Sequence, residues 1–219
     1  ERSEEMLKIA RGGFAFKGIG VYYDLGLYDT LAIAAHEGWH QYTQRAFRSA
    51  LPVWLEEGIA VYNEGHRWDR STPVFKPWAN LERYDRLAEA TKTGELFSLE
   101  DLLNSSPQSY FDSRGDELLT YYAQLWAFVH FLNEHDDGAH RASLRVLLRD
   151  VASGDVTRVL EKRLGPEAAR RTLLSREGPA LFFAYFEEDL ETVNESYLEF
   201  VERITAPNAR SKIAEGVSP

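Results

Sequence analysis

The sequence contains no cysteine, and this absence excludes several kinds of chemistry. Without thiols the chain cannot form disulfide bonds, a cysteine-ligated zinc site or an iron–sulfur cluster, and it has no thiol nucleophile. The sequence also lacks any apolar run close to the roughly 20 residues that cross a bilayer as a helix. Its longest apolar stretches are residues 31–35 and 181–186, so we expect no membrane span.

Basic residues are also few. The chain has 25 Lys and Arg against 35 Asp and Glu, and its formal net charge is −10. Since the phosphates of nucleic acids attract basic surfaces, we expect no nucleic-acid partner. The 44% hydrophobic and 27% charged residues are typical of a globular protein. The chain begins with Glu1 and shows no signal-peptide pattern, as expected of a processed form or a piece of a longer protein.

The spacing of apolar residues predicts an α+β protein that is mostly helical. A hairpin is expected near the N-terminus, at residues 14–16 and 19–23, with its turn at Lys17 and Gly18. Helices are expected at residues 1–10, 31–47, 52–63, 80–92, 99–103, 116–134, 139–153, 155–164, 166–175 and 179–204, the last in one or two pieces. Caps are expected at Asp29 or Thr30, at Asn80, and at Ser98 in a capping box with Asp101. Residues 66–79 and 104–115 are expected to be loops.

The most informative segment is the H-E-x-x-H motif of His36, Glu37 and His40 within a predicted helix. Residues four apart lie on one face of a helix, so both imidazoles can bind one metal ion. Glu37 lies close enough to that face to take a proton from a metal-activated water that attacks a carbonyl. The alternative is a pair of core histidines that form hydrogen bonds with their neighbours. The helix is apolar on more than one side, which favours a central position.

A second segment, residues 51–60, offers a third metal ligand. A catalytic zinc site with two histidines needs one more protein ligand and one open position. This segment carries Glu56 and Glu57 on an otherwise apolar helix, where a carboxylate is costly unless it is paired or bound to metal. The alternative is that both are simply solvated. Helical periodicity does not distinguish between the two glutamates.

The H-E-x-x-H motif followed by P-x-W-L-x-E-G-x-A resembles the gluzincin metallopeptidases. The closest resemblance is to the peptidase-MA-like domains of uncharacterised bacterial proteins, and a more distant one is to thermolysin and the zinc aminopeptidases. The resemblance implies one zinc ion per chain, bound by His36, His40 and Glu57 with a water in the fourth position. It implies hydrolysis of a peptide or protein substrate, with Glu37 as the general base. It also favours an extracytoplasmic location in a bacterium.

Two further stretches resemble the same family. Residues 13–23 are similar to the edge strand, which pairs with an extended substrate, and to the strand before the active-site helix. Residues 122–132 are similar to the helix after the third ligand, where the aminopeptidases carry a tyrosine that stabilises the oxyanion. Tyr122 is the matching residue and Tyr121 is its rival. The alternative is that both tyrosines only pack.

The domain organisation follows from these assignments. We expect an upper zincin-like lobe at residues 1–65, a helical lower lobe at 66–205 and a mobile tail at 206–219. Only about 28 residues precede the active-site helix, which is similar to a minigluzincin or to a piece that lacks early strands. The rival hypothesis is a zinc-containing binding or scaffold module with little or no catalytic activity.

Two other positions near the motifs are candidates for a role. Glu64 or Asn63 could orient a zinc-binding histidine from behind, although a solvated surface position is equally consistent with the sequence. His66 could reach the cleft, but a histidine in a predicted loop is more often at the surface.

Overall fold

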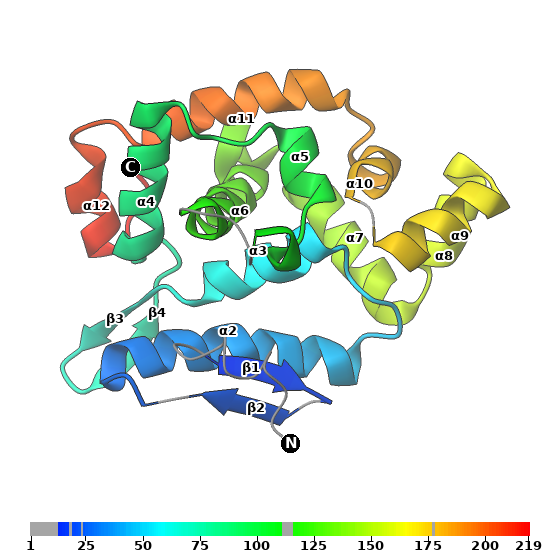
Figure 1. Cartoon of the computed structure of the whole chain (residues 1–219). Coiled ribbons are helices and arrows are strands. Elements are labelled where there is room, and N and C mark those ends of the chain that lie inside the picture. The colour runs from blue at the N-terminus through cyan, green and yellow to red at the C-terminus, as the bar shows by residue number, and fades with distance from the viewer. Residues whose placement is uncertain (1–12, 18, 23, 111–115, 177) are drawn as a thin grey trace.

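The computed structural model describes residues 13–17, 19–22, 24–110, 116–176 and 178–219 (Figure 1). Over these residues the protein is α+β and mostly helical, which confirms the predicted fold class. The helix expected at residues 1–10 lies outside the described residues. No helix in the described part of the chain is both long enough and apolar enough to cross a membrane.

The elements follow one another in a simple order. Two antiparallel hairpins are present among the described residues, β1 (Gly13–Phe16) with β2 (Ile19–Tyr22) and β3 (His66–Asp69) with β4 (Thr72–Phe75). The helices are α2 (Leu27–Ala46), α3 (Val53–Asn63), α4 (Leu81–Thr93), α5 (Leu99–Asn104), α6 (Glu117–Glu134), α7 (Arg141–Ser153), α8 (Val156–Leu164), α9 (Pro166–Ser175), α10 (Gly178–Phe186), α11 (Leu190–Ile204) and α12 (Ala209–Glu215). Short 3₁₀ helices lie at Pro107–Tyr110 and His135–Gly138.

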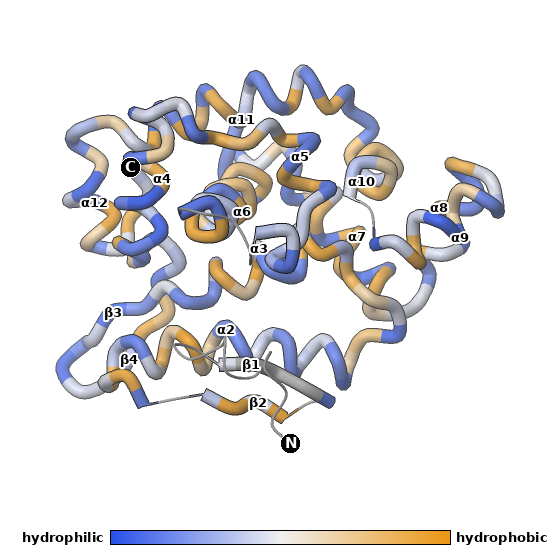
Figure 2. The backbone as a smooth tube through the Cα atoms, viewed as in Figure 1, coloured by the Kyte–Doolittle hydropathy of each residue, from blue (hydrophilic) through white to orange (hydrophobic). Residues whose placement is uncertain are grey.

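The elements form layers that place α2 between the first hairpin and the helical lobe. The β1–β2 hairpin covers one side of α2, and α3 lies against the other side (Figure 1). Helix α3 packs on α6, which also contacts α4, α7 and α11. Helix α6 is the most enclosed, since residues 120–132 are all buried except Tyr122. Helix α11 alternates between hydrophobic and hydrophilic residues, as expected of a helix that covers a core on one face (Figure 2).

Glycines allow the first hairpin to lie close to α2. A Cβ atom on Gly20 would come within 1.9 Å of Nε2 of Gln41, and one on Gly13 within 2.8 Å of Cγ2 of Ile33. Lys17 has φ 51° at the tight turn of the hairpin, where the sequence predicts it. A Cβ atom on Gly13 would also lie 2.9 Å from the backbone carbonyl of Val21, so a side chain there would push the strands apart, whereas at position 20 the flexible end of Gln41 would have to move. The close approach places β1 next to the H-E-x-x-H motif.

Helix α2 begins earlier than its sequence predicts. It starts at Leu27 after Gly26, and neither Asp29 nor Thr30 caps it. The hydroxyl of Thr30 instead accepts a hydrogen bond from the backbone N–H of Leu25 at 3.0 Å, within the turn before the helix. Asp29 lies in the first helical turn, where a negative charge interacts favourably with the helix dipole. Thr30, a residue type that often caps helices, therefore stabilises the turn before α2 and does not cap the helix itself.

Two other helix caps are confirmed. The side chain of Asn80 accepts a hydrogen bond from the backbone N–H of Arg83 and begins α4. The hydroxyl of Ser98 accepts one from the backbone N–H of Asp101 and begins α5. Both caps are local interactions three residues apart, which explains why the sequence predicts them correctly.

Two segments differ from their predictions. Residues 66–75, expected within a loop, form the β3–β4 hairpin, and Pro73 is accommodated because a two-stranded hairpin consists only of edge strands. The predicted mobile tail contains α12, whose Ala209 and Ile213 are buried against the rest of the chain. Helix α12 packs on α4, and both Nε and Nη2 of Arg210 lie 2.8 Å from the carboxylate of Asp85. Ala209 and Ile213 are four residues apart and so lie on one face of α12, which packs this face against the rest of the chain.

Candidate metal centre

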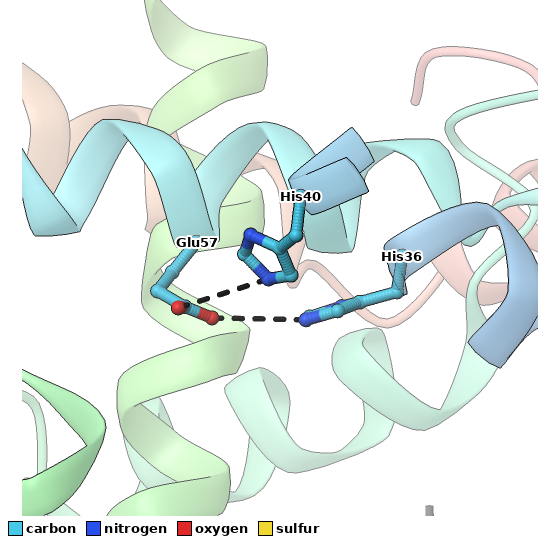
Figure 3. Close-up of side chains that lie close together, drawn as sticks. All are labelled: His36, His40 and Glu57. Atoms are coloured by element: carbon cyan, nitrogen blue, oxygen red, sulfur yellow. Dashed lines mark ion pairs between the residues drawn. The ribbon is translucent and has the colours of Figure 1, made fainter. Parts of the chain in front are cut away.

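The two histidines of the motif and one glutamate of α3 converge at the junction of α2 and α3. His36 and His40 are one turn apart on α2, with ring centroids 5.0 Å from each other. Nε2 of His36 lies 3.7 Å from Oε2 of Glu57, and Nε2 of His40 lies 3.8 Å from Oε1 of the same carboxylate (Figure 3). One ligand atom from each residue lies within 4.8 Å of the other two, so this cluster could hold a metal ion.

The position of Glu57 depends on how α3 packs against α6. Trp54 and Leu55 are completely buried, and they direct this face of α3 into the core. Gly58 follows the glutamate, and a Cβ atom there would come within 2.9 Å of Cγ2 of Val129 on α6. The small residue lets the two helices approach closely. The W-L-x-E-G pattern thus encodes a buried face and a close contact, which together turn the carboxylate of Glu57 towards α2.

A charged network lies behind His36. Nδ1 of His36 lies 2.9 Å from Oε1 of Glu64, at the end of α3. The carboxylate of Glu64 also accepts hydrogen bonds from Nδ2 of Asn80 at 2.9 Å and from Nε and Nη2 of Arg83, both at 3.1 Å. Burial opposes the charge of Glu64, but Arg83 and His36 outweigh it and lower the pKa of Glu64 to about 2. Glu64 is therefore an ionised acceptor that fixes the His36 ring.

A second network lies behind His40. Nδ1 of His40 lies 3.5 Å from Oε1 of Glu56, which also accepts a hydrogen bond from Thr43 at 3.2 Å. The guanidinium of Arg176 donates to the other carboxylate oxygen of Glu56. Burial raises the pKa of Glu56, but the contacts with His40 and Arg176 outweigh it and hold that pKa below its ordinary value. The adjacent glutamates thus have different positions: Glu57 faces both Nε2 atoms, and Glu56 lies behind one ring.

The pKa of His36 is raised in the metal-free protein, which favours the protonated ring. Burial disfavours that charge, but the hydrogen bonds and charges of Glu57 and Glu64 outweigh it and raise the pKa of His36 to about 10. Since Nδ1 faces Glu64, the proton that metal must displace is the one on Nε2 towards Glu57. Metal binding at this cluster is therefore expected to release a proton.

Glu37 lies beside the cluster at a cleft. The cleft has a volume of about 360 Å³, and its lining includes Gly13 of β1, Ile33, His36, Glu37 and Arg83. Glu37 itself is only 7% exposed, and this burial raises the pKa of its carboxyl despite the nearby histidines. A carboxylate of raised pKa that borders a cleft beside possible metal ligands is suited to accept a proton.

The two tyrosines of α6 point in different directions. The ring of Tyr122 lies 6.2 Å from the ring of His36, and the guanidinium carbon of Arg83 lies 5.3 Å from its centroid. Tyr121 is completely buried, and its hydroxyl donates to the backbone carbonyl of Ser105 at 3.1 Å. Burial and the charge of Glu57 raise the pKa of Tyr122 well above its ordinary value, so its phenol keeps its proton. Tyr122 is the tyrosine of this pair that faces the cluster.

Several residues of the networks were not predicted. The sequence offers Glu64 or Asn63 as an orienting residue, and Glu64 makes the contact. Arg83 and Arg176 carry no local signal, because they join the networks only through the packing of α4 and of the segment after α9. His66 is buried in β3, where its ring stacks on Tyr28 at 4.3 Å, and it lies outside the cluster.

The fold and the cluster define a mostly helical α+β protein with a candidate metal centre of two histidines and one glutamate. Residues 30–150, more than half of the chain, match the family described as "Protein of unknown function (DUF1570)", and the chain belongs to that family. The matched segment contains all of the cluster together with Glu37 and Tyr122. No curated protein and no solved structure matches the chain. The family description names no activity.

Proposed function

We propose that this protein is a zinc-dependent peptidase. The observation that carries the proposal is the convergence of two imidazole nitrogens and the Glu57 carboxylate beside the buried Glu37, at the edge of a cleft. Such a site has the parts that hydrolysis of a peptide bond needs: three metal ligands, a base that is not among them, and space for a substrate.

The donor set fits zinc. Two neutral imidazoles and one carboxylate form the ligand set of several catalytic zinc sites, which keep a fourth position open for water or substrate. The carboxylates of Glu64 and Glu56 lie next to Nδ1 of His36 and His40, so each histidine is oriented with Nε2 towards the shared centre. A histidine pair that served only to fill the core would not need a carboxylate behind each ring and a third between them.

The remaining residues have distinct roles in the proposed reaction. A bound zinc ion would supply Lewis acidity, which lowers the pKa of a water molecule and polarises a substrate carbonyl. Glu37 would take the proton of the attacking water and deliver it to the leaving amine. The phenol of Tyr122 would donate a hydrogen bond to the carbonyl oxygen as this atom gains negative charge.

Metal analysis and a peptide-cleavage assay test the proposal together. The purified protein should contain one zinc ion per chain and should cleave members of a mixed peptide library. Glu37→Gln should keep its zinc and lose activity by about 10²–10⁴-fold, because an amide cannot accept the proton. Glu191→Gln, an exposed position on α11, is the matched control and should retain full activity.

The results also distinguish the rival function. A zinc-loaded protein that cleaves no peptide in the library would favour a binding or scaffold module. Cleavage that persists at the wild-type rate in Glu37→Gln would exclude this residue as the base. Both outcomes are separate from the question of metal binding, which the metal analysis answers directly.

A further inference from the structure

We infer that Arg176 is a positioning residue for the metal centre, and that it acts through Glu56 on His40. This inference rests on the proposed metal site. It assigns a role to a segment, residues 165–190, for which the sequence provides no motif and which lies outside the part matched by the family.

The position of Arg176 is specified by its backbone and by two contacts. The residue ends α9 with φ 57°, a left-handed conformation that is uncommon for a residue with a side chain. From there Nε donates to the backbone carbonyl of Leu51 at 2.7 Å, and Nη2 donates to the carboxylate of Glu56. The guanidinium therefore joins the start of α3 to the side chain behind His40. It links segments that are 120 or more positions apart in the sequence.

The contact is part of a repeated arrangement around the cluster. Behind His36 stands the Glu64 carboxylate, held by Arg83, and behind His40 stands the Glu56 carboxylate, held by Arg176. In each case an arginine fixes a carboxylate that faces Nδ1 of a histidine. Partners that orient metal ligands in this way typically contribute 10–100-fold to metal affinity or activity. Arg176 thus holds the carboxylate behind His40, as Arg83 holds the carboxylate behind His36.

Whether removal of Arg176 weakens or strengthens metal binding distinguishes a positioning role from a purely electrostatic one. A positive charge near the centre repels a divalent cation, so a purely electrostatic role predicts tighter metal binding when Arg176 is removed. A positioning role predicts weaker binding, because Glu56 then has more orientations and His40 is held less well. The side chain of Arg176 is one-third exposed, so solvent screens much of its charge.

The experiment measures zinc affinity by competition with a chromophoric chelator, in the full-length protein and without reference to peptide cleavage. Arg176→Asn is the main variant, because asparagine tolerates a left-handed backbone but lacks the guanidinium. Its dissociation constant for zinc should rise about tenfold, at the lower end of the range for orienting partners. Arg171→Asn is the matched control, since Arg171 lies on the same helix and pairs only with the exposed Glu167 among the described residues.

Two further measurements show whether the effect passes through Glu56. In a Glu56→Gln background, Arg176→Asn should raise the zinc dissociation constant little further, because the contact between Arg176 and residue 56 is already weakened. The visible absorption of bound Co²⁺ should change in Arg176→Asn and recover most of its wild-type form in Arg176→Lys, which keeps a positive charge for Glu56. This spectrum reports ligand geometry, which a variant that is merely less stable would not alter.

Three results would overturn the inference: unchanged zinc affinity and Co²⁺ spectrum in Arg176→Asn, tighter zinc binding in that variant, or an equal loss in the presence and absence of Glu56. A protein that binds zinc normally but cleaves no peptide would reject the proposed peptidase function and leave this test valid.

Discussion

Nδ1 of His36 lies 2.9 Å from Oε1 of Glu64, and the same carboxylate binds Arg83 through two further hydrogen bonds. This arrangement fixes the orientation of one possible metal ligand before any metal is present. Nε2 of the ring is thereby directed to Glu57, 3.7 Å away. A site that is organised in this way binds metal without paying the full entropy of ordering its ligands.

The two histidines should both be essential for metal binding. His36→Ala and His40→Ala should each lose most of the bound zinc, because a site with three protein ligands cannot spare one. Metal content after dialysis measures this directly. His135→Ala, at a histidine in the 3₁₀ helix after α6, should keep its zinc. Near-full zinc occupancy in both cluster variants would refute the assignment.

The adjacent glutamates should respond differently to substitution. Glu57→Ala should abolish measurable zinc binding, since Glu57 faces both Nε2 atoms. Glu56→Ala should weaken binding by about 10–100-fold, as expected for a residue that orients a ligand. Zinc titration of both variants measures the difference. If affinity collapses in Glu56→Ala and survives in Glu57→Ala, the third ligand has been assigned one position too late.

Substitution of Tyr122 should slow turnover without affecting zinc. Tyr122→Phe should lower kcat at least tenfold and leave KM and zinc content nearly unchanged, because the hydroxyl acts mainly in the transition state. Tyr121→Phe is the matched control, since its hydroxyl contacts the backbone of Ser105 in the core. Steady-state kinetics on a cleaved library peptide give both parameters. Full activity in both variants would show that the oxyanion donor lies elsewhere.

The stability of the metal-free protein should depend on Glu64 in acid. The folded-state pKa of Glu64 is lowered from 4.5 to about 2, so its stabilisation is present above about pH 4.5 and is lost as the pH falls towards 2. Urea unfolding of the wild type and Glu64→Gln should show a difference in unfolding free energy that shrinks by roughly 3 kcal/mol over this range, at about 1.4 kcal/mol per pKa unit.

The acid range separates Glu64 from His36. The pKa of His36 is raised, so its stabilisation is present below about pH 6.5 and is lost only as the pH rises towards about 10. The wild type and Glu64→Gln are therefore compared between pH 2 and 5, below the range in which His36 loses its charge. A constant difference for Glu64→Gln over the same range would show that Glu64 is not ionised in the folded protein.

Local sequence was sufficient to predict much of the helical structure and to place the H-E-x-x-H motif on a helix. The caps at Asn80 and Ser98 act over three residues, and the i, i+4 spacing places His36 and His40 on one face of any helix. Glu57 was indicated only by its resemblance to a known pattern, since periodicity does not separate it from Glu56. These predictions depend on contacts within one or two helical turns.

Long-range packing accounts for what the sequence did not indicate. Arg83 is 19 residues from Glu64, and Arg176 is 120 residues from Glu56, so no spacing rule connects either pair. Arg83 on α4 reaches Glu64 at the end of α3, and Arg176 at the end of α9 reaches Glu56 near the start of α3. These contacts form only when the helices are assembled. Packing also decides which tyrosine of α6 faces the cluster. Tyr121 and Tyr122 point about 100° apart around the helix, and the Tyr122 ring lies near His36 while the Tyr121 hydroxyl lies in the core. Helical periodicity specifies that angle, but the neighbours of each face are set by the assembled helices.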